Sequence, residues 1–548
     1  MEVALRRPLL AAALAGLALA GCGDDEGAES SGPASLAPAE SVVYAEGVLR
    51  PEGELRTALD TSLSALLDSE DPGALIVAEL NQQLAEDDSE ITYEIDIEPW
   101  LGERGAVFFT SLYGSGEASG DETAGAADED DSFAGEGVEG AFVIEATDTE
   151  AAQAFTDTAG AEEGSVEESS YEGVDYKVGG GGDAFGIVGD ALVFGSEQGL
   201  RAAVDTEAGD ESLAGDADFS SLLGSEADAA GTLFVDVPEI VTEAEAAGEL
   251  TGSELETIDS LFAGIADEPL TAVLDAEPDG FGLELSYGAT DLPFLAAAEE
   301  SALLRELPGD SWLAAGFTDV GDAIASFLDG AGDLGVAADE LDAIRDQFRR
   351  EYGLELEEFY EPLGDGAFFA NGEGIFGTGG GVVLETDDPE AAGRLIAGLE
   401  RAAKRGGEQV RSLSGGNSGA EGFSITIDEA PGAINFVAGG DRIVIAYGDA
   451  ATGAAFEPGE AGGTLGESEG FSAAEDALGE DFDVTGYLDF APLVELLGFA
   501  SATDPSLQQA LPYLESLDFV ITGAGSDGEH ERMRLFLGVA DVVAEPSA

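Results

Sequence analysis

The sequence predicts an α+β fold built from two tandem homologous domains, each a largely antiparallel sheet with packed helices. Two observations lead to this prediction. Short segments recur in the same order in the two halves of the chain. Within each half, apolar runs joined by short turns alternate with segments of helical spacing. Adjacent strands with helices between the sets favour antiparallel α+β domains over a doubly wound parallel sheet.

The recurring segments are short, and it is their shared order that indicates a duplication. In chain order the pairs are Pro38-Ala-Glu-Ser41 with Pro308-Gly-Asp-Ser311, Glu98-Pro-Trp-Leu-Gly102 with Glu361-Pro-Leu-Gly364, Gly105–Phe109 with Gly366–Phe369, Val143–Glu145 with Val383–Glu385, Gly189-Asp190 with Gly440-Asp441, and Phe234–Asp236 with Tyr487–Asp489. A one-residue slip would turn the core face of a strand to water. We therefore expect superposed domains to place Ser41 on Ser311, Pro99 on Pro362, Phe109 on Phe369, Asp148 on Asp388 and Asp236 on Asp489.

These matches divide the chain into segments. The predicted segments are a signal peptide at 1–22, a flexible acidic tether at 23–37, repeat 1 at 38–290, a linker at 291–304, repeat 2 at 305–541 and a tail at 542–548. Repeat 1 carries an extra low-complexity acidic stretch at 114–137, which we interpret as a solvated loop.

Within a repeat the expected order is strand, helix pair, strand hairpin, helix, three strands, helices and strand hairpin. Ser41–Glu46 is apolar and β-branched, as in a strand, and leucines at helical spacing follow from Leu55. Asp388 is a predicted N-cap, with Pro389 at the first helical position and Gly406 just past the end.

The N-terminus has the pattern of an exported lipoprotein. Arg6 and Arg7 precede an apolar stretch at Leu9–Ala20, which is too short for a bilayer core that needs about 20 residues. Leu19-Ala-Gly-Cys22 resembles the bacterial lipobox, whose cysteine is acylated, and Cys22 is the only cysteine of the sequence. An ordinary secretory signal with an incidental cysteine is the alternative. With no second cysteine, disulfides and thiol catalysis in the mature body are excluded.

The charge balance excludes a class of partners. The sequence has 116 Asp and Glu against 19 Lys and Arg, a net charge of −97, yet it is 44% hydrophobic and can bury a core. A surface with this charge repels nucleic acid and bare anionic membranes. We therefore expect no nucleic-acid partner.

Most matches to catalytic motifs are rejected, because the residues they need or the flanking secondary structure are missing from the sequence. His530 is the only histidine, so histidine-based metal clusters and histidine pairs are excluded. Gly466-Glu-Ser468-Glu-Gly470 matches a nucleophile elbow but follows no predicted strand, and its counterpart in repeat 1 is Asp216. Gly372–Gly377 matches a dinucleotide fingerprint but is followed by a strand, which predicts a hairpin turn. We expect no cofactor, no metal and no catalytic residues, although a carboxylate pair remains open.

One local excess of basic residues stands out in this acidic chain. Arg394, Arg401 and Arg405 share one face of the helix after Asp388, with Lys404 beside them. Two interpretations remain: local pairing with surrounding acids, or a docking face for an anionic wall polymer, head group or acidic partner.

The Pro38–Tyr44, Glu98–Gly102 and Leu307–Trp312 segments resemble a family of uncharacterised, secreted or lipid-anchored bacterial proteins catalogued only as a domain of unknown function. The resemblance implies an envelope location and no catalytic residues. We expect a non-catalytic lipoprotein, anchored by Cys22 on the extracytoplasmic face of the cell membrane, whose duplicated domains bind a partner or ligand. The alternatives are a solute-binding lipoprotein of a transporter and a carboxylate-based envelope hydrolase.

The net charge generates a prediction about stability. A compact state at −97 repels itself, and the screening length falls from about 10 Å at 0.1 M salt to about 3 Å at 1 M. The melting temperature should rise clearly with sodium chloride over this range. A melting temperature that stays flat or falls would show that the acids are already compensated in the folded protein.

Overall fold

The computed structural model describes the chain from residue 32 to residue 540, with internal gaps. The residues outside the description are 1–31, 87–88, 90, 114–137, 164–165, 180–181, 224–228, 253–254, 256–263, 289–300, 331–337, 373, 415–419, 428–431, 459–461, 502–504, 527, 529 and 541–548. The described residues form two compact units, unit 1 from 32 to 288 and unit 2 from 301 to 540.

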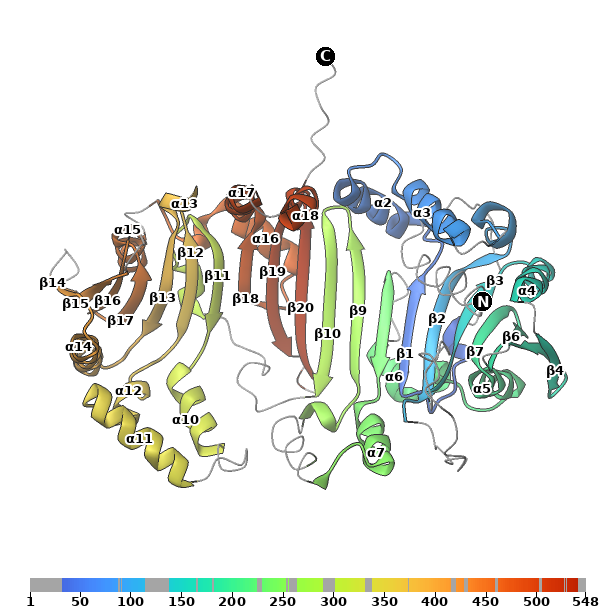
Figure 1. Ribbon diagram of the computed structural model, residues 1–548, viewed down its shortest axis with the longest axis horizontal. Helices are drawn as coiled ribbons and strands as arrows, with labels where there is room; N and C mark the ends of the chain where they lie inside the picture. Colours follow the sequence, from blue (N-terminus) through green and yellow to red (C-terminus); the bar gives the residue numbers. More distant parts are fainter. Residues whose placement is uncertain are drawn as a thin grey trace, which may run out of the picture. The chain divides into compact units, whose positions relative to one another are not determined.

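Unit 1 contains ten described strands in one antiparallel arrangement, in the order β10-β9-β8-β1-β2-β3-β7-β6-β5-β4 (Figure 1). Their bounds are β1 Val43–Val48, β2 Leu101–Ser111, β3 Glu139–Ala146, β4 Glu167–Tyr171, β5 Val174–Val178, β6 Asp183–Val188, β7 Ala191–Ser196, β8 Gly231–Val235, β9 Leu270–Glu277 and β10 Gly280–Gly288. The helices are η1 Pro33–Ser35, α2 Gly53–Leu67, α3 Pro72–Glu86, the π-helix η2 Tyr93–Ile97, α4 Thr149–Glu163, α5 Glu197–Ala208, η3 Leu213–Gly215, α6 Ala217–Leu223 and α7 Val237–Ala247.

Both faces of the sheet of unit 1 carry apolar side chains, because residues alternate between the faces along each strand. On one face Tyr44 and Phe108 are fully buried, in a core that also contains Leu200 of α5 and Leu223 of α6. On the other face Ile144 packs with Phe155 of α4 and with residues of η2 and α3. This second core lies toward β3 and β7 and leaves the strands from β10 to β2 less covered on that face.

Unit 2 pairs its ten described strands in the corresponding order, β20-β19-β18-β11-β12-β13-β17-β16-β15-β14. Their bounds are β11 Ser311–Phe317, β12 Gly366–Asn371, β13 Gly379–Glu385, β14 Val410–Ser414, β15 Glu421–Thr426, β16 Ala433–Gly439, β17 Arg442–Tyr447, β18 Asp483–Asp489, β19 Leu517–Ser526 and β20 His530–Val539. The helices are α9 Ala302–Arg305, α10 Val320–Gly330, α11 Ala338–Tyr352, α12 Glu357–Tyr360, α13 Gly374–Gly377, α14 Pro389–Gly406, α15 Asp449–Phe456, η5 Leu465–Glu467, α16 Glu469–Leu478, α17 Phe490–Ser501 and α18 Pro505–Glu515.

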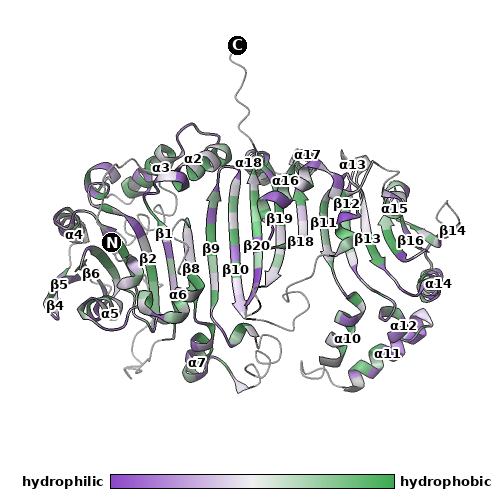
Figure 2. Ribbon diagram, turned by 180° about the vertical axis from the view of Figure 1, so that it is seen from behind, coloured by the Kyte–Doolittle hydropathy of each residue, from purple (hydrophilic) through white to green (hydrophobic). Residues whose placement is uncertain are grey.

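Two cores cover the sheet of unit 2 in the same way. One contains Leu304 of α9, Phe471 of α16 and Phe369 of β12. The other packs Leu395 and Ile396 of α14 against β15 and β17. Hydrophilic residues lie along the outer faces of α11 and α14, as Figure 2 shows. The predicted α+β class, with antiparallel sheets and packed helices, is confirmed.

Local hydrogen bonds also correspond between the units. The amide of Leu213 donates to the carbonyl of Ala37, and that of Leu465 to the carbonyl of Leu307, both at 2.8 Å. Asp148 and Asp388 each accept from the amide three residues later, at 3.0 and 2.9 Å, so both begin a helix as N-caps. The N-cap prediction for Asp388 is therefore confirmed.

The structure corrects three details of the sequence interpretation. Register pairs Tyr44 with Phe108 and Ala314 with Phe369, so Phe108, and not Phe109, corresponds to Phe369. Four strands follow α4, where three were expected. Gly406 is the last residue of α14, and Gly407 follows it with a positive φ of 91°.

Candidate functional site

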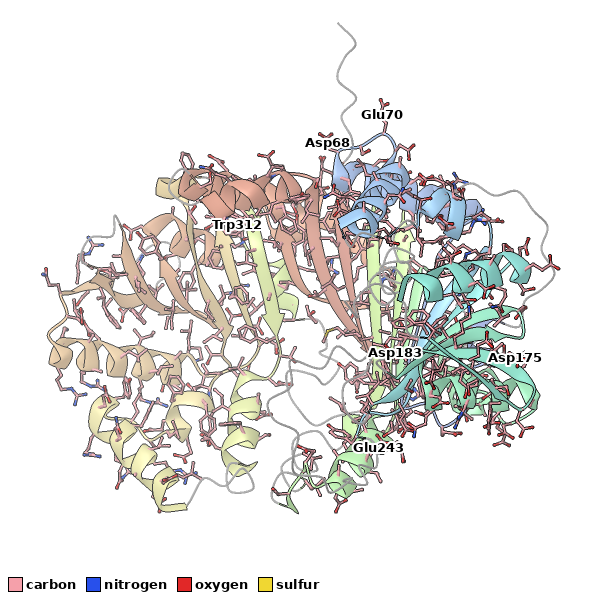
Figure 3. All side chains as sticks on the ribbon, turned by 45° about the vertical axis from the view of Figure 1, so that its right-hand side comes forward. Asp68, Glu70, Asp175, Asp183, Glu243 and Trp312 are labelled. Carbon is pink, nitrogen blue, oxygen red and sulfur yellow. The ribbon has the colours of Figure 1, made fainter. Side chains whose placement is uncertain are left out.

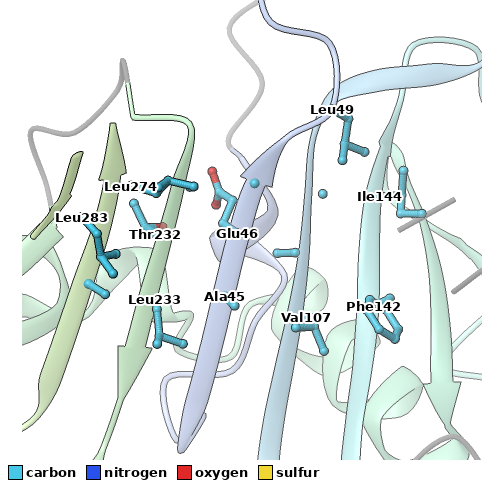
Figure 4. A pocket seen from close by; sticks show the side chains of 15 residues that line it. Ala45, Glu46, Leu49, Val107, Phe142, Ile144, Thr232, Leu233, Leu274 and Leu283 are labelled. Atoms are coloured by element: carbon cyan, nitrogen blue, oxygen red, sulfur yellow. The ribbon is translucent and has the colours of Figure 1, made fainter. Parts of the chain in front are cut away.

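An apolar groove of about 270 Å³ lies on the less covered face of unit 1. Figure 4 shows its floor, formed by neighbouring strands of the sheet. Its walls are large apolar side chains, which in order from β3 to β10 are Ile144, Phe142, Val107, Leu233, Leu274 and Leu283. Leu49, which follows β1, also lines the groove and is buried. Leu283 is 36% exposed, so the groove is open to solvent at β10.

The groove exists because two glycines face each other at its centre. Register places Gly47 of β1 opposite Gly105 of β2. Neither residue has a side chain to fill the space between Leu49 and Val107. A Cβ at Gly105 would lie 2.9 Å from Cδ1 of Leu49, so even alanine would crowd this position. Leu49 therefore packs over Gly105, and the glycine pair leaves this part of the groove floor without side chains of its own.

Unit 2 has a phenylalanine where unit 1 has Gly47. Phe317 of β11 pairs with Gly366 of β12, in the register that joins Gly47 to Gly105. The Phe317 ring lies over Gly366, because a Cβ built on that glycine would overlap it. In unit 1 the corresponding place, over Gly105, is taken by Leu49, so the two units cover this glycine with different side chains.

One acid, Glu46, belongs to the groove lining, but its carboxylate lies on the Tyr44 side of β1, where it is already engaged. Glu46 accepts a hydrogen bond from the Tyr44 hydroxyl and pairs with Nη1 of Arg104 at 2.6 Å. Burial and then the Glu46 charge raise the pKa of Tyr44 well above its ordinary value, so the phenol stays neutral. Burial alone would lower the pKa of Arg104, but its hydrogen bond with Glu46 raises it.

The groove can therefore bind through apolar contact, with about 25 cal/mol gained per Å² of apolar surface removed from water. Of the described residues that line it, Glu46 is the one titratable group. General acid–base work needs a group free to exchange a proton with substrate. The Glu46 carboxylate is held by Tyr44 and Arg104 instead.

The groove was missed by sequence reasoning because its lining comes from six strands between Ala45 and Leu283. A signal was nevertheless present in the aligned repeats. Once Ser41 is placed on Ser311, Gly47 falls on Phe317. A glycine opposite a large aromatic residue at one strand position marks a place where the two copies pack differently.

The sequence-predicted site residues have different outcomes. Cys22 and the acidic stretch 114–137 lie outside the described residues. Arg394, Arg401, Lys404 and Arg405 are all exposed on α14. Lys404 pairs with Glu400 at 2.7 Å, and this hydrogen bond lowers the pKa of Glu400.

Arg405 is engaged by backbone rather than by an acid. Its guanidinium donates to the carbonyls of Arg350 and Glu351, the former at 2.9 Å, at the end of α11. These carbonyls carry the negative end of the helix dipole and lack partners within the helix. Arg405 therefore caps α11, and the Arg401 guanidinium lies beside Gly353 just after it.

The rejected catalytic motifs have structural roles. Ser468 accepts a hydrogen bond from the amide of Phe471 and caps α16, as Asp216 does for Phe219 in unit 1. The segment Gly372–Gly377 connects the paired strands β12 and β13, as the hairpin prediction requires, and contains α13. In the described part of the chain, no three His, Cys, Asp or Glu residues are placed to hold a metal ion.

A second hollow, of about 480 Å³, lies in unit 2 beside the β16–β17 turn. Glu306, Asp441 and Arg442 line it, and Glu306 forms an ion pair with Arg442. Nearby, burial and the charge of Asp365 raise the pKa of Glu385. In this hollow one of the two lining acids, Glu306, is held by an arginine, which disfavours a free carboxylate pair there.

Comparison with protein families now adds to this geometry. A family model described as "Protein of unknown function (DUF3352)" matches residues 76–539. The chain belongs to this family. The match runs from α3 of unit 1 to the last residue of β20 in unit 2, so one family model spans both units.

No curated protein and no solved structure matches the chain. Among the residues that the structure describes, no helix is long and apolar enough to cross a membrane.

The contacts of the basic residues generate a prediction that separates capping from docking. Arg405→Ala should destabilise the protein by about 0.3–1 kcal/mol, because the last carbonyls of α11 lose a cationic donor. Arg394→Ala, on the same face of α14, should leave stability unchanged. Urea denaturation of both variants measures the difference. Equal losses in both would show that Arg405 has no special role at the end of α11.

Proposed function

We propose that this member of the DUF3352 family is a non-catalytic lipoprotein of the cell envelope. Cys22 anchors it to the extracytoplasmic face of the membrane, and its duplicated α+β domains bind a partner or ligand. The observation that carries the binding role is the apolar groove of unit 1. A concave site lined by apolar side chains is the usual form of a small-molecule site.

The sequence before residue 32 supports the anchor. It combines two arginines, a short apolar stretch and a single cysteine at the position where a lipobox requires it. Acyl chains on Cys22 would hold the protein at the membrane, since each buried CH₂ group contributes about 0.8 kcal/mol.

The strand pairing supports the duplication. Each unit joins ten described strands in the same order, and corresponding N-caps and turn hydrogen bonds recur. Unrelated halves with similar composition have no reason to share both the topology and these local bonds. In this proposal the copies have diverged, and unit 1 kept or gained an open groove.

The alternatives have less support. A solute-binding lipoprotein would be favoured by parallel strands with crossover helices, whereas the described pairings in both units are antiparallel. A carboxylate-based hydrolase needs one acid to donate a proton and a second as base or nucleophile. The acid of the groove is paired with Arg104, and Glu306 is paired with Arg442. The anionic docking face retains Arg394 and Arg401, since Arg405 and Lys404 have local partners.

The anchor is tested by Cys22→Ser. The wild-type chain should begin at Cys22, partition into detergent and sediment with membranes, because its acyl chains are buried there. The variant should be released or accumulate as an unprocessed precursor. Fractionation with mass spectrometry of the N-terminus makes the measurement. A wild-type protein found free in solution with another, unmodified N-terminal residue contradicts the proposal.

The binding role is tested with an uncharged dye that fluoresces in apolar surroundings. The full chain should bind it saturably, and Gly47→Phe should abolish binding, because the new ring projects from β1 into the groove. A thermal melt of this variant checks that the folded protein accommodates the new ring beside Leu49. Phe317→Gly is the matched opposite change and should add a second site. If Gly47→Phe bound the dye as well as the wild-type chain does, the groove would not be the binding site.

A further inference from the structure

The shape of the groove restricts its occupant to something long and narrow. Its lining comes from β3, β2, β1, β8, β9 and β10, so it runs across six neighbouring strands. With neighbouring strands about 4.8 Å apart, that is a path of roughly 24 Å. A cavity of about 270 Å³ along this path has room for a single extended chain of atoms.

The lining excludes a polypeptide backbone as the buried part of the ligand. The walls are aliphatic and aromatic side chains, with glycine and alanine on the floor. The backbone groups of the floor strands already pair with one another in the sheet. A peptide laid in the groove would bury N–H and C=O groups without partners, which is costly. A hydrocarbon chain has no such groups.

The charges of unit 1 restrict the part of the ligand that stays outside. Five basic residues occur between positions 32 and 288, and each is engaged within the unit. Their partners are the Leu101 carbonyl for Arg50, Asp60 for Arg56, Glu46 for Arg104, Asp157 for Lys177 and Glu197 for Arg201. Exposed acids remain, among them Asp68, Glu70 and Asp175, which project from unit 1 in Figure 3. An anionic head group would meet repulsion and find no uncommitted cation.

We propose that the groove of unit 1 binds the acyl chain of a lipid whose head group carries no net negative charge, such as a zwitterionic phospholipid. This inference rests on the proposed binding role of the groove and names its ligand class. The negative surface of unit 1 does not repel a head group without net negative charge. The apolar lining, which crosses six strands, contacts the acyl chain. In the described part of unit 2, the Phe317 ring lies over Gly366 at the position that corresponds to the Gly47–Gly105 pair.

The experiment uses the full-length Cys22→Ser chain, so that no anchor of its own competes for lipid. Lysophosphatidylcholine with an environment-sensitive fluorophore on its acyl chain is titrated below its critical micelle concentration. Lysophosphatidylglycerol with the same labelled chain is the anionic comparison. Gly47→Phe fills the groove, and Phe317→Gly opens the matching position of unit 2. Thermal melts of each variant show that the fold is retained.

The phosphatidylcholine analogue should bind saturably, and Gly47→Phe should weaken its binding by at least about tenfold. The phosphatidylglycerol analogue should bind more weakly at 0.1 M salt, and the difference should shrink at about 1 M, where charges are screened. Equal affinity for the two head groups at low salt would overturn the head-group assignment. Binding that survives Gly47→Phe in a folded variant would overturn the site.

One outcome separates this inference from the proposed function. If the uncharged dye binds in the groove but neither lysolipid does, the groove remains a binding site and the acyl-chain assignment is wrong. If neither the dye nor the lysolipids bind to the folded chain, both proposals fail.

Discussion

The double pairing of β1 is the constraint on which the organisation of unit 1 depends. This strand is hydrogen-bonded to β2 on one side and to β8 on the other, so its register is fixed twice. Alternation along it then sends Tyr44 into the α5–α6 core and turns Ala45 and Gly47 toward the groove. A shift of one residue would bury Gly47 in the core and place the Tyr44 ring in the groove. The register of β1 therefore fixes both the core on one face of the sheet and the groove on the other.

Unit 2 has the same strand order, but single residues at corresponding positions give it a different surface. Phe317 stands where unit 1 has Gly47, and Asp365 precedes Gly366 where Arg104 precedes Gly105. The second change alters the charge around corresponding glutamates. In unit 1 the amide of Arg104 donates to Glu145, beside a guanidinium that neutralises Glu46. In unit 2 burial and Asp365 raise the pKa of Glu385, and Arg442 from a neighbouring strand opposes that shift. The two units thus share a strand order, while the charges around corresponding glutamates depend on the neighbouring residues of each unit.

Periodicity and turn residues were enough to predict the fold class and the Asp388 cap, because these depend on neighbours in sequence. Pairing depends on partners far along the chain, which explains the slip between Phe108 and Phe109. Both are phenylalanines, and only the register with Tyr44 shows which one faces the core. The groove was missed for the same reason, since six separated strands line it. The basic residues of α14 were recognised as a cluster, but the bond from Arg405 to the end of α11 depends on how the two helices pack.

The acidity of the chain and the open groove are compatible for a physical reason. An exposed apolar surface ordinarily favours association between copies. Two copies that each carry an excess of negative charge repel one another at short range, so the groove can stay open without pairing with its counterpart on another chain. The same repulsion acts on anionic head groups but leaves a neutral hydrocarbon chain unaffected. The negative net charge therefore disfavours anionic ligands, whereas the apolar lining of the groove distinguishes little between one hydrocarbon chain and another. Salt should weaken this repulsion of anionic ligands and at the same time stabilise the fold, because it screens the same carboxylates in both cases.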